Sequence, residues 1–216
     1  MSKVRTLEDL SNRLNDDLTW RKRELSKLKA MIETERSDME RSRVLLRSGL
    51  TLLYAHWEGF IKEAGSLYLE YVAMQRLNYD QLTSNFLALA FKKRLAEVNE
   101  THKATIYTTS LDFIRFQLSQ RSQIPYKEGI RTGSNLSSEV LKEIICILGL
   151  EYDFYETKQK LIDTKLLAKR NQIAHGEYLD LDAEDYAALQ KQIITMIDHF
   201  KAQIENNASQ EKYKSP

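Results

Sequence analysis

The sequence predicts an all-α protein, a bundle of long helices. Glycine and proline, which end helices and form tight turns, number only 7 and 2 among 216 residues. Apolar residues recur three or four positions apart over long stretches, which is the spacing of an amphipathic helix. Hydrophobic residues make up 42% and charged residues 29% of the chain, as in a globular rather than a disordered protein. Together these observations favour a helical bundle.

The first element is a long amphipathic helix over about 7–35. Thr6 precedes Glu8 and Asp9, and a hydroxyl followed by acidic residues is typical of a capped helix start. A second helix, about 38–72, is apolar nearly all round at its centre, so we expect it to be the most buried. Glycines weaken a helix unless backbones approach closely, and three in this helix predict tight packing there: Gly49, Gly59 and Gly65.

Five further helical patterns complete the chain. Ser137 and Gly149 bracket one of them, as a capping serine and a terminating glycine should. Asp182, followed by Asp185, marks the start of the last helix. The helices are expected at about 79–98, 103–120, 137–148, 155–174 and 183–204.

We expect a single domain over 1–205, in which the N-terminal helix packs on the bundle or extends as an arm. The segment 206–216 is polar and predicts a frayed tail. Residues 121–135 form the one clear loop, with the internal proline and three basic residues against one acid. Such a loop is a flexible insertion or a substrate-facing element, and the insertion is the simpler interpretation.

Charge and composition exclude several classes of function. The net charge of +1 means that any nucleic-acid site must be a local patch. The most apolar stretch, 44–61, is interrupted by Arg47, His56 and Glu58, which argues against a membrane span. No secretory signal is visible, so we expect a cytoplasmic protein that does not bind membranes. The single cysteine, Cys146, lies in an apolar run and is expected in the core of a protein from a reducing compartment.

No cofactor or metal site is expected from the motifs. The four histidines and the one cysteine show no metal-ligand spacing, and phosphate-loop and serine-hydrolase motifs do not occur. The histidines are His56, His102, His175 and His199. Of these, His56 is expected to pack or to form a hydrogen bond, and His102 and His199 to lie on the surface or on a helix face.

One segment carries groups suited to phosphate chemistry. Arg170, Asn171 and His175 lie at the end of an expected helix, just before Gly176. Asn171 and His175 are four residues apart and share a face, whereas Arg170 lies on another side. A guanidinium offers paired donors to phosphate, and histidine exchanges protons near neutral pH. On spacing alone, a histidine that interacts with the helix dipole is the simpler interpretation.

Three segments together resemble the HEPN superfamily. The run Arg-Asn-x-x-Ala-His-Gly, from Arg170 to Gly176, resembles its Arg-x4–6-His signature. Tyr54 and Glu58 resemble the Tyr-x-x-x-Glu segment on the central helix of a bacterial HEPN branch. The segment 132–136, which leads into the helix that ends at Gly149, is similar to that branch as well.

The resemblance implies a helical bundle that forms a homodimer through its motif-bearing helices. Many HEPN domains are metal-independent endoribonucleases in toxin–antitoxin, abortive-infection or other host-defence systems. Arg170 would then bind the scissile phosphate, His175 would serve as acid and base or orient the attacking 2′-hydroxyl, and Asn171 would position one of them. The expected products are a 2′,3′-cyclic phosphate and a 5′-hydroxyl. RNA is the implied substrate, and an antitoxin or effector protein is an implied partner.

Supporting residues follow from the same resemblance. Glu58 would orient the motif arginine across the bundle, whereas its simpler alternative is a salt bridge to Lys62 four residues on. Basic residues precede the motif, so Lys169 and Arg131 are candidate weak contacts to RNA.

Two alternatives to the ribonuclease stay open. One is a non-catalytic HEPN binding module that acts as the helical partner of another protein or binds a nucleotide. The other is an unrelated helical dimerisation protein in which His175 only caps a helix. Some HEPN toxins carry His-x-Tyr after the motif, where a partner enzyme modifies the tyrosine. Tyr178 lies one residue too far from His175 for that pattern, so no role is assigned to it.

Overall fold

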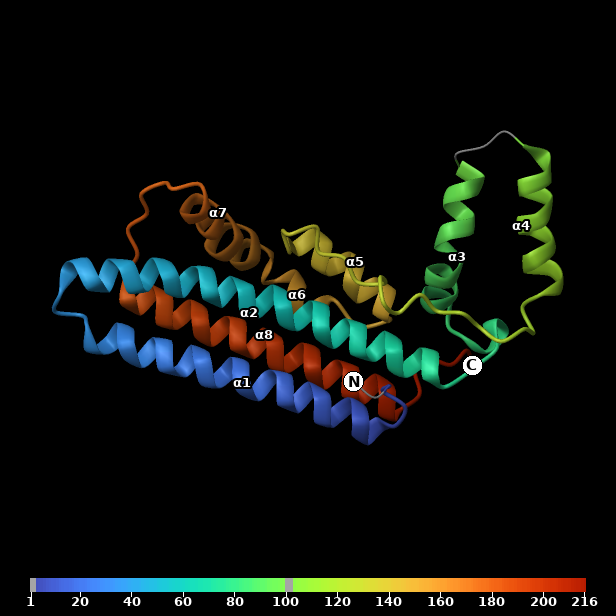
Figure 1. Cartoon of the computed structure of the whole chain (residues 1–216), viewed down its shortest axis with the longest axis horizontal. Coiled ribbons are helices and arrows are strands. Elements are labelled where there is room, and N and C mark those ends of the chain that lie inside the picture. Colours follow the sequence, from blue (N-terminus) through green and yellow to red (C-terminus); the bar gives the residue numbers. More distant parts are fainter. Residues whose placement is uncertain (1–2, 100–102) are drawn as a thin grey trace.

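The computed structural model of the chain describes residues 3–99 and 103–216, and this part is all-α, as predicted, with no strand (Figure 1). His102 lies outside these residues. The elements are α1 (Leu7–Thr34), α2 (Met39–Met74), η1 (Tyr79–Gln81), α3 (Ser84–Asn99), α4 (Ala104–Phe116), α5 (Ser138–Leu148), α6 (Asp153–Glu156), η2 (Leu161–Ala168), α7 (Lys169–Ala174) and α8 (Ala183–Ser209). Here η1 is a 3₁₀ turn and η2 is a π-helix.

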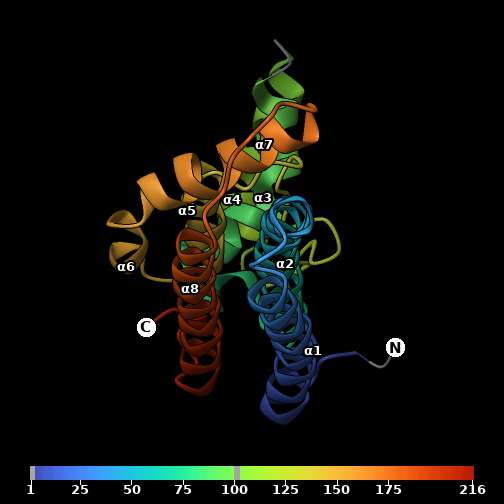
Figure 2. The same ribbon diagram turned by 90° about the vertical axis from the view of Figure 1, so that its left-hand side faces the viewer.

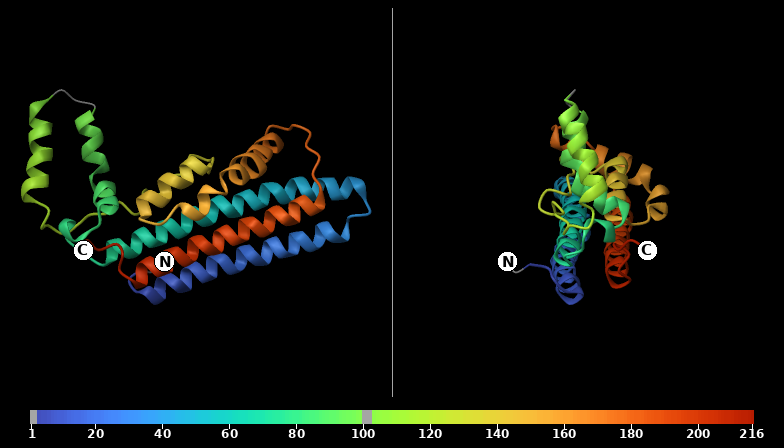
Figure 3. Two further views of the ribbon diagram at one scale, coloured as in Figure 1. Left: turned by 180° about the vertical axis from the view of Figure 1, so that it is seen from behind. Right: turned by 90° about the vertical axis from the view of Figure 1, so that its right-hand side faces the viewer.

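Three long helices, α1, α2 and α8, run side by side and form the main core (Figures 1 and 3). The capped start predicted for α1 is present and is a capping box, since Thr6 Oγ1 accepts from the Asp9 backbone N–H at 3.0 Å and Asp9 accepts from the Thr6 N–H. Leu10 and Leu14 of α1 are fully buried, so the N-terminal helix is part of the bundle and not an arm. The central helix α2 buries large side chains such as Trp57 and Phe60, as expected.

The glycines of α2 allow the close packing that the sequence predicts. A Cβ on Gly59 would lie 2.8 Å from Nη1 of Arg21, and one on Gly49 would lie 3.2 Å from the ring of Tyr186. Arg21 is buried between α1 and α2, where its Nε is 2.8 Å from the carboxylate of Asp17. Nearby, His56 is also buried, as expected, and its Nε2 lies 2.7 Å from the carboxylate of Glu24 on α1.

A second layer, made of α5, α6, η2 and α7, lies on the side of α2 remote from α1 (Figure 2). The single helix expected over 155–174 is interrupted, because α6 ends at Glu156 and a turn precedes η2. The buried residues of η2 are Leu161, Ile162, Leu166 and Leu167. They recur five positions apart, which matches the i to i+5 hydrogen bonding of a π-helix rather than the i to i+4 bonding of an α-helix.

The helices α3 and α4 form a hairpin that projects from one end of the bundle (Figures 1 and 3). A small separate core of Tyr79, Phe91 and Phe113 holds it together. The fourth helix was expected to reach 120, but α4 ends at Phe116 and a turn follows.

The C-terminal segment is packed against the bundle, so the prediction of a frayed tail from residue 206 was wrong. Helix α8 continues to Ser209, and the side chain of Tyr213 is only 1% exposed and contacts the ring of Tyr71. The Thr83 N–H donates to the Tyr213 carbonyl at 3.1 Å. The segment is polar overall, so the prediction overlooked that one aromatic residue, Tyr213, packs it against the bundle.

The expectation of a buried cysteine was also wrong, since Cys146 is exposed. The residues that α5 buries are on one face, namely Ser138, Leu141, Ile144, Ile145 and Leu148, and Cys146 falls on the other. None of the helices in the described residues is long and apolar enough to cross a lipid bilayer.

Gly149 provides a test of how α5 ends. Its φ is +65°, it terminates α5 as predicted, and an added Cβ would lie 3.0 Å from Nδ2 of Asn85, which donates to the Ile147 carbonyl. We expect Gly149→Ala to lower the free energy of unfolding by about 2 kcal/mol, from the left-handed backbone and the displaced amide. Gly133, at φ +59° with nothing within 4 Å of an added Cβ, is the matched control. Gly133→Ala should cost about 1 kcal/mol, and equal losses in urea unfolding would contradict the role of Asn85.

Candidate functional site

The guanidinium of Arg170 is held by two separate parts of the chain. Its Cζ lies 3.9 Å from the centre of the Tyr54 ring on α2, a cation–π stack. Its Nη2 donates to the Ser134 carbonyl at 2.8 Å and to Oδ1 of Asn135 at 3.3 Å. The Nε atom is buried and has no hydrogen-bond partner among the described residues. Arg170 is therefore fixed in place while part of its donor capacity stays unused.

The carbonyl that Arg170 contacts belongs to a tight turn over residues 132–135. Gly133 and Ser134 have φ values of +59° and +65°, and the Asn135 N–H donates to the Thr132 carbonyl at 3.1 Å. Two successive residues with positive φ define a type I′ turn. Ser134 occupies a backbone region that side-chain-bearing residues rarely adopt, and such strain is concentrated at functional sites.

The loop that carries this turn is packed on the bundle, so the interpretation of 121–135 as a flexible insertion was wrong. Ile124 and Ile130 are buried, and Ile130 contacts α2 at Gly65. Thr132 is buried as well. Apolar residues spaced along a polar loop dock it on α2, and this docking places Ser134 and Asn135 beside Arg170.

Tyr54 connects the turn to Glu58. Its hydroxyl accepts a hydrogen bond of 2.7 Å from the Leu136 N–H. Burial raises the pKa of Tyr54 above its ordinary value, whereas the Leu136 N–H and Arg170 oppose this and the nearby carboxylate of Glu58 adds to it. The Tyr54 ring thus lies between the arginine and the acid.

Glu58 itself is half-buried, and within residues 3–99 and 103–216 it forms no ion pair shorter than 4 Å with Arg170 or with Lys62. Glu58 therefore forms an ion pair with neither predicted partner. Its carboxylate instead lies close enough to the Tyr54 hydroxyl to raise the pKa of that group.

Replacing Tyr54 with phenylalanine tests the link between α2 and the turn. Tyr54→Phe keeps the ring under Arg170 but leaves the buried Leu136 N–H without its acceptor. We expect the free energy of unfolding to fall by about 1–3 kcal/mol, measured by urea denaturation. Tyr152→Phe is the control, because the hydroxyl of Tyr152 donates to the part-buried Ser138 carbonyl and accepts from the exposed Nε2 of Gln159, so its loss leaves no fully buried group without a partner. A loss as large in Tyr152→Phe would contradict a special role for the Tyr54 hydroxyl.

His175 lies at the exposed end of α7. The Gly176 N–H donates to the Ile173 carbonyl and the Glu177 N–H to the Gln172 carbonyl, with Gly176 at φ +78°. These two bonds form a Schellman motif, which ends α7 at Ala174 and makes His175 its C-cap residue. The His175 side chain is exposed and forms no hydrogen bond or ion pair with another described residue.

Asn171 is half-buried, and its carbonyl accepts from the His175 backbone N–H at 2.9 Å. Among the described residues no hydrogen bond or ring contact joins Arg170 to His175. One chain therefore brings the three motif residues to the same short helix, with the arginine fixed and the histidine free in solvent.

Neither of the two candidate RNA contacts forms a hydrogen bond or ring contact with Arg170 among the described residues. Arg131 is 74% exposed at its side chain and pairs with Glu128 at 3.1 Å. Lys169 is half-buried and lines a pocket between α7 and α8, together with Lys165. Within the described part of the chain no group of three or more histidine, cysteine, aspartate or glutamate side chains could hold a metal ion.

Sequence reasoning did not identify the residues that hold Arg170. Tyr54 and the turn at 132–136 contributed to the resemblance, but no contact to the arginine was inferred from them. The signal was present, because Gly-Ser-Asn is a turn-forming run and an arginine often stacks on a nearby aromatic ring. The turn and Arg170 come into contact because the loop 121–135 is docked on α2.

The fold and the site define a class: all-α bundles that carry an arginine and a histidine five residues apart on one short helix over the central helix. The model of the family described as HEPN_MAE_28990-like HEPN matches residues 10–213. The chain therefore belongs to the HEPN family, which its sequence resembled. Searches of the curated proteins and of the solved structures each gave no match.

Proposed function

We propose that this protein is an endoribonuclease that cleaves RNA without a metal ion, as part of a toxin–antitoxin or anti-phage defence system. The HEPN family, to which the chain belongs, is commonly one of ribonucleases. One observation on α7 carries the proposal. The guanidinium of Arg170 is held in place while its Nε–H has no partner among the described residues, and the side chain of His175 at the end of α7 is exposed.

In this mechanism the 2′-hydroxyl of RNA attacks the adjacent phosphate. Arg170 binds the phosphate and stabilises the charge that develops on its oxygens, which a pre-positioned guanidinium does well. His175 accepts the proton of the 2′-hydroxyl or donates one to the leaving 5′-oxygen. Asn171 positions the histidine or the phosphate. The nucleophile is part of the RNA, and the products are a 2′,3′-cyclic phosphate and a 5′-hydroxyl.

The test is cleavage of a short RNA by the purified protein in excess EDTA. The control substrate is the same strand with 2′-deoxy nucleotides throughout. We expect cleavage of the RNA alone, with products that carry 2′,3′-cyclic phosphate ends. Loss of cleavage in EDTA, equal cleavage of both strands, or products with 3′-hydroxyl ends would each contradict the mechanism.

A homodimer through the motif-bearing helices belongs to this proposal. An apolar groove of about 590 Å³ lies between α2 and α7 and is lined by Val44, Thr51, Leu52, Ala55 and Ile173, among others. Val44 is 63% exposed although it is apolar. A second copy of the chain that covers this groove would bring its own α7 close to the first, and the two sets of arginine and histidine would face one cleft.

Substitution in the groove tests the dimer. Thr51 is exposed there and donates its hydroxyl to the Arg47 carbonyl at 3.1 Å. We expect Thr51→Arg to shift the protein to a monomer, measured by sedimentation velocity, and to reduce cleavage by about tenfold or more because the composite cleft is lost. Thr195→Arg is the matched control, since Thr195 on α8 is exposed and makes the same bond to the Lys191 carbonyl. A wild-type monomer, or a Thr51→Arg variant that stays dimeric, would contradict the interface.

Arg131 and Lys169 remain proposed as secondary contacts to the RNA backbone, and Glu58 as a positioning residue behind Tyr54. A partner protein such as an antitoxin is also proposed. The projecting α4 supports it, because Leu111 and Phe116 are exposed there and exposed apolar groups mark interaction surfaces. The same surface favours the second candidate, a non-catalytic helical partner, which predicts a stable complex and no RNA cleavage.

A further inference from the structure

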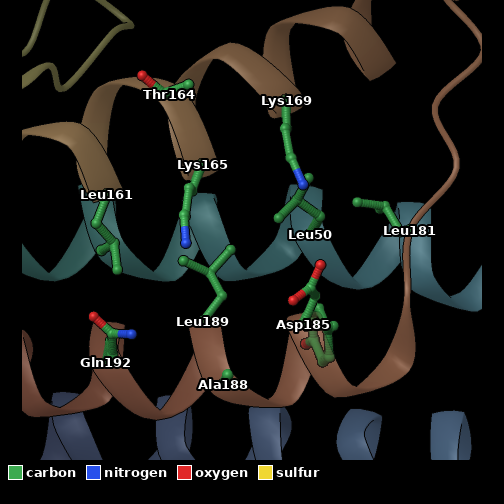
Figure 4. A pocket seen from close by; sticks show the side chains of 11 residues that line it. Leu50, Leu161, Thr164, Lys165, Lys169, Leu181, Asp185, Ala188, Leu189 and Gln192 are labelled. Atoms are coloured by element: carbon green, nitrogen blue, oxygen red, sulfur yellow. The ribbon is translucent and has the colours of Figure 1, made fainter.

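A pocket of about 210 Å³ lies between η2, α7 and α8, over α2 (Figure 4). Leu50, Leu161, Leu181 and Leu189 form its apolar part. Figure 4 shows Lys165 and Lys169 extending from η2 and α7 towards α8, whereas Asp185 and Gln192 extend from α8 towards them. The volume is smaller than the roughly 300–1,000 Å³ of common ligand pockets, so the pocket suits a compact molecule.

The two lysines are not neutralised by the protein. They are four residues apart on one helical segment, and neither forms an ion pair or hydrogen bond with another described residue. Like charges at this spacing repel each other. The one acid in the lining, Asp185, lies farther than 4 Å from both ammonium groups, since no ion pair joins them within the described residues. The pocket therefore carries a net positive charge on its α7 side.

The wall of the pocket on α8 includes a buried tyrosine. Tyr186 lines the pocket, is only 3% exposed, and its hydroxyl is buried without a hydrogen-bond partner among the described residues. Burial raises the pKa of Tyr186, so the hydroxyl keeps its proton. The hydroxyl is closed off from solvent and its end of the ring packs on Gly49, so Tyr186 adds apolar surface to the pocket rather than a donor.

We propose that this pocket binds a small phosphate monoester. The phosphate lies between Lys165 and Lys169, which bind phosphate as point charges. The carbon skeleton packs on the leucines, and a ligand hydroxyl donates to Asp185 or Gln192. The proposed site uses neither Arg170 nor His175, so it does not depend on RNA cleavage, and Lys169 is its one residue that is also a proposed RNA contact. Because both lysines belong to the segment that continues into Arg170 and His175, a bound ligand joins this segment to α8.

The test is isothermal titration of the full chain with ribose 5-phosphate. We expect binding of one molecule per chain, weakened at least tenfold in Lys165→Gln/Lys169→Gln. The matched control is Lys158→Gln/Lys160→Gln, which removes the same charge from the same stretch of chain but not from the pocket. Binding by this control should stay within about twofold of the wild type, because charges outside the pocket are screened.

Asp185→Asn is expected to strengthen the binding of ribose 5-phosphate, in contrast to the lysine substitutions. It removes the negative charge from the pocket while the amide oxygen still accepts, so ribose 5-phosphate should bind about threefold more tightly, as electrostatic repulsion is removed. An RNA tetranucleotide with 2′-O-methyl groups is titrated in parallel. Absence of ribose 5-phosphate binding, equal loss in both double variants, or binding of the RNA alone would each overturn the small-molecule site.

Discussion

Replacing His175 with alanine is expected to slow RNA cleavage by about 10²–10⁴-fold, the usual contribution of a general acid or base. The stability should change by less than about 0.5 kcal/mol, because the side chain is exposed and contacts no other described residue. The rate is measured in single-turnover cleavage of RNA in EDTA, and the stability by urea unfolding. Loss of the rate without loss of stability is the signature of a residue that acts on substrate.

His199→Ala is the control with the opposite pattern. His199 is stacked on Phe154 with ring centres 4.0 Å apart, and its Nδ1 lies 3.3 Å from the Tyr155 hydroxyl. Its loss should cost about 1–2 kcal/mol of stability and leave cleavage by the folded protein unchanged. If His175→Ala instead lowers stability by about 1 kcal/mol or more and cleavage persists, His175 is a helix cap and the catalytic role is excluded.

Arg170→Lys should reduce cleavage by about 10²–10³-fold although the charge is kept, which is the effect of removing one donor that stabilises developing charge. A lysine cannot offer the planar pair of donors, nor stack on Tyr54 while it bonds to the Ser134 carbonyl. The expected signature is a lower single-turnover rate at saturating enzyme, with RNA affinity changed much less.

Arg131→Lys is the matched control for this substitution. Arg131 is exposed, and Arg131→Lys keeps the charge that a secondary contact to the RNA backbone needs, so the rate should change less than about twofold. Equal rates for Arg170→Lys and the wild type would show that only the charge of Arg170 matters. Equal losses in both variants would show that the effect comes from general RNA binding.

The sequence predicted those features that local patterns encode. The limits of α5 were read from its capping residues, and Ser137 Oγ does accept from the Val140 N–H at one end while Gly149 adopts φ +65° at the other. The burial of α2 was predicted because apolar residues occur on nearly all sides of its central part. Both depend on residues that are neighbours along the chain, so spacing alone was sufficient.

The contacts of Arg170 could not be predicted in the same way. Its partner Ser134 is 36 positions away, and their meeting depends on the positive φ of two turn residues and on loop docking through Ile130. The packing of the C-terminus was missed for a similar reason, because a single Tyr213 in a polar segment gives no periodic signal. The π-helix within 155–174 did have a visible signal, the spacing of five residues from Leu161 to Leu166 and from Ile162 to Leu167, but a regular α-helix was assumed.

The length of η2 also determines the direction in which the side chains of the following helix α7 point, because the two helices are continuous. Each residue advances a helix by about 100°, so the loss of a single codon within 161–168 would rotate the motif by that angle. Asn171 would then take the position over Tyr54, and Arg170 would be turned towards α8. In this stretch of the gene, a change of length therefore threatens the arginine–tyrosine contact more than most changes of amino acid do.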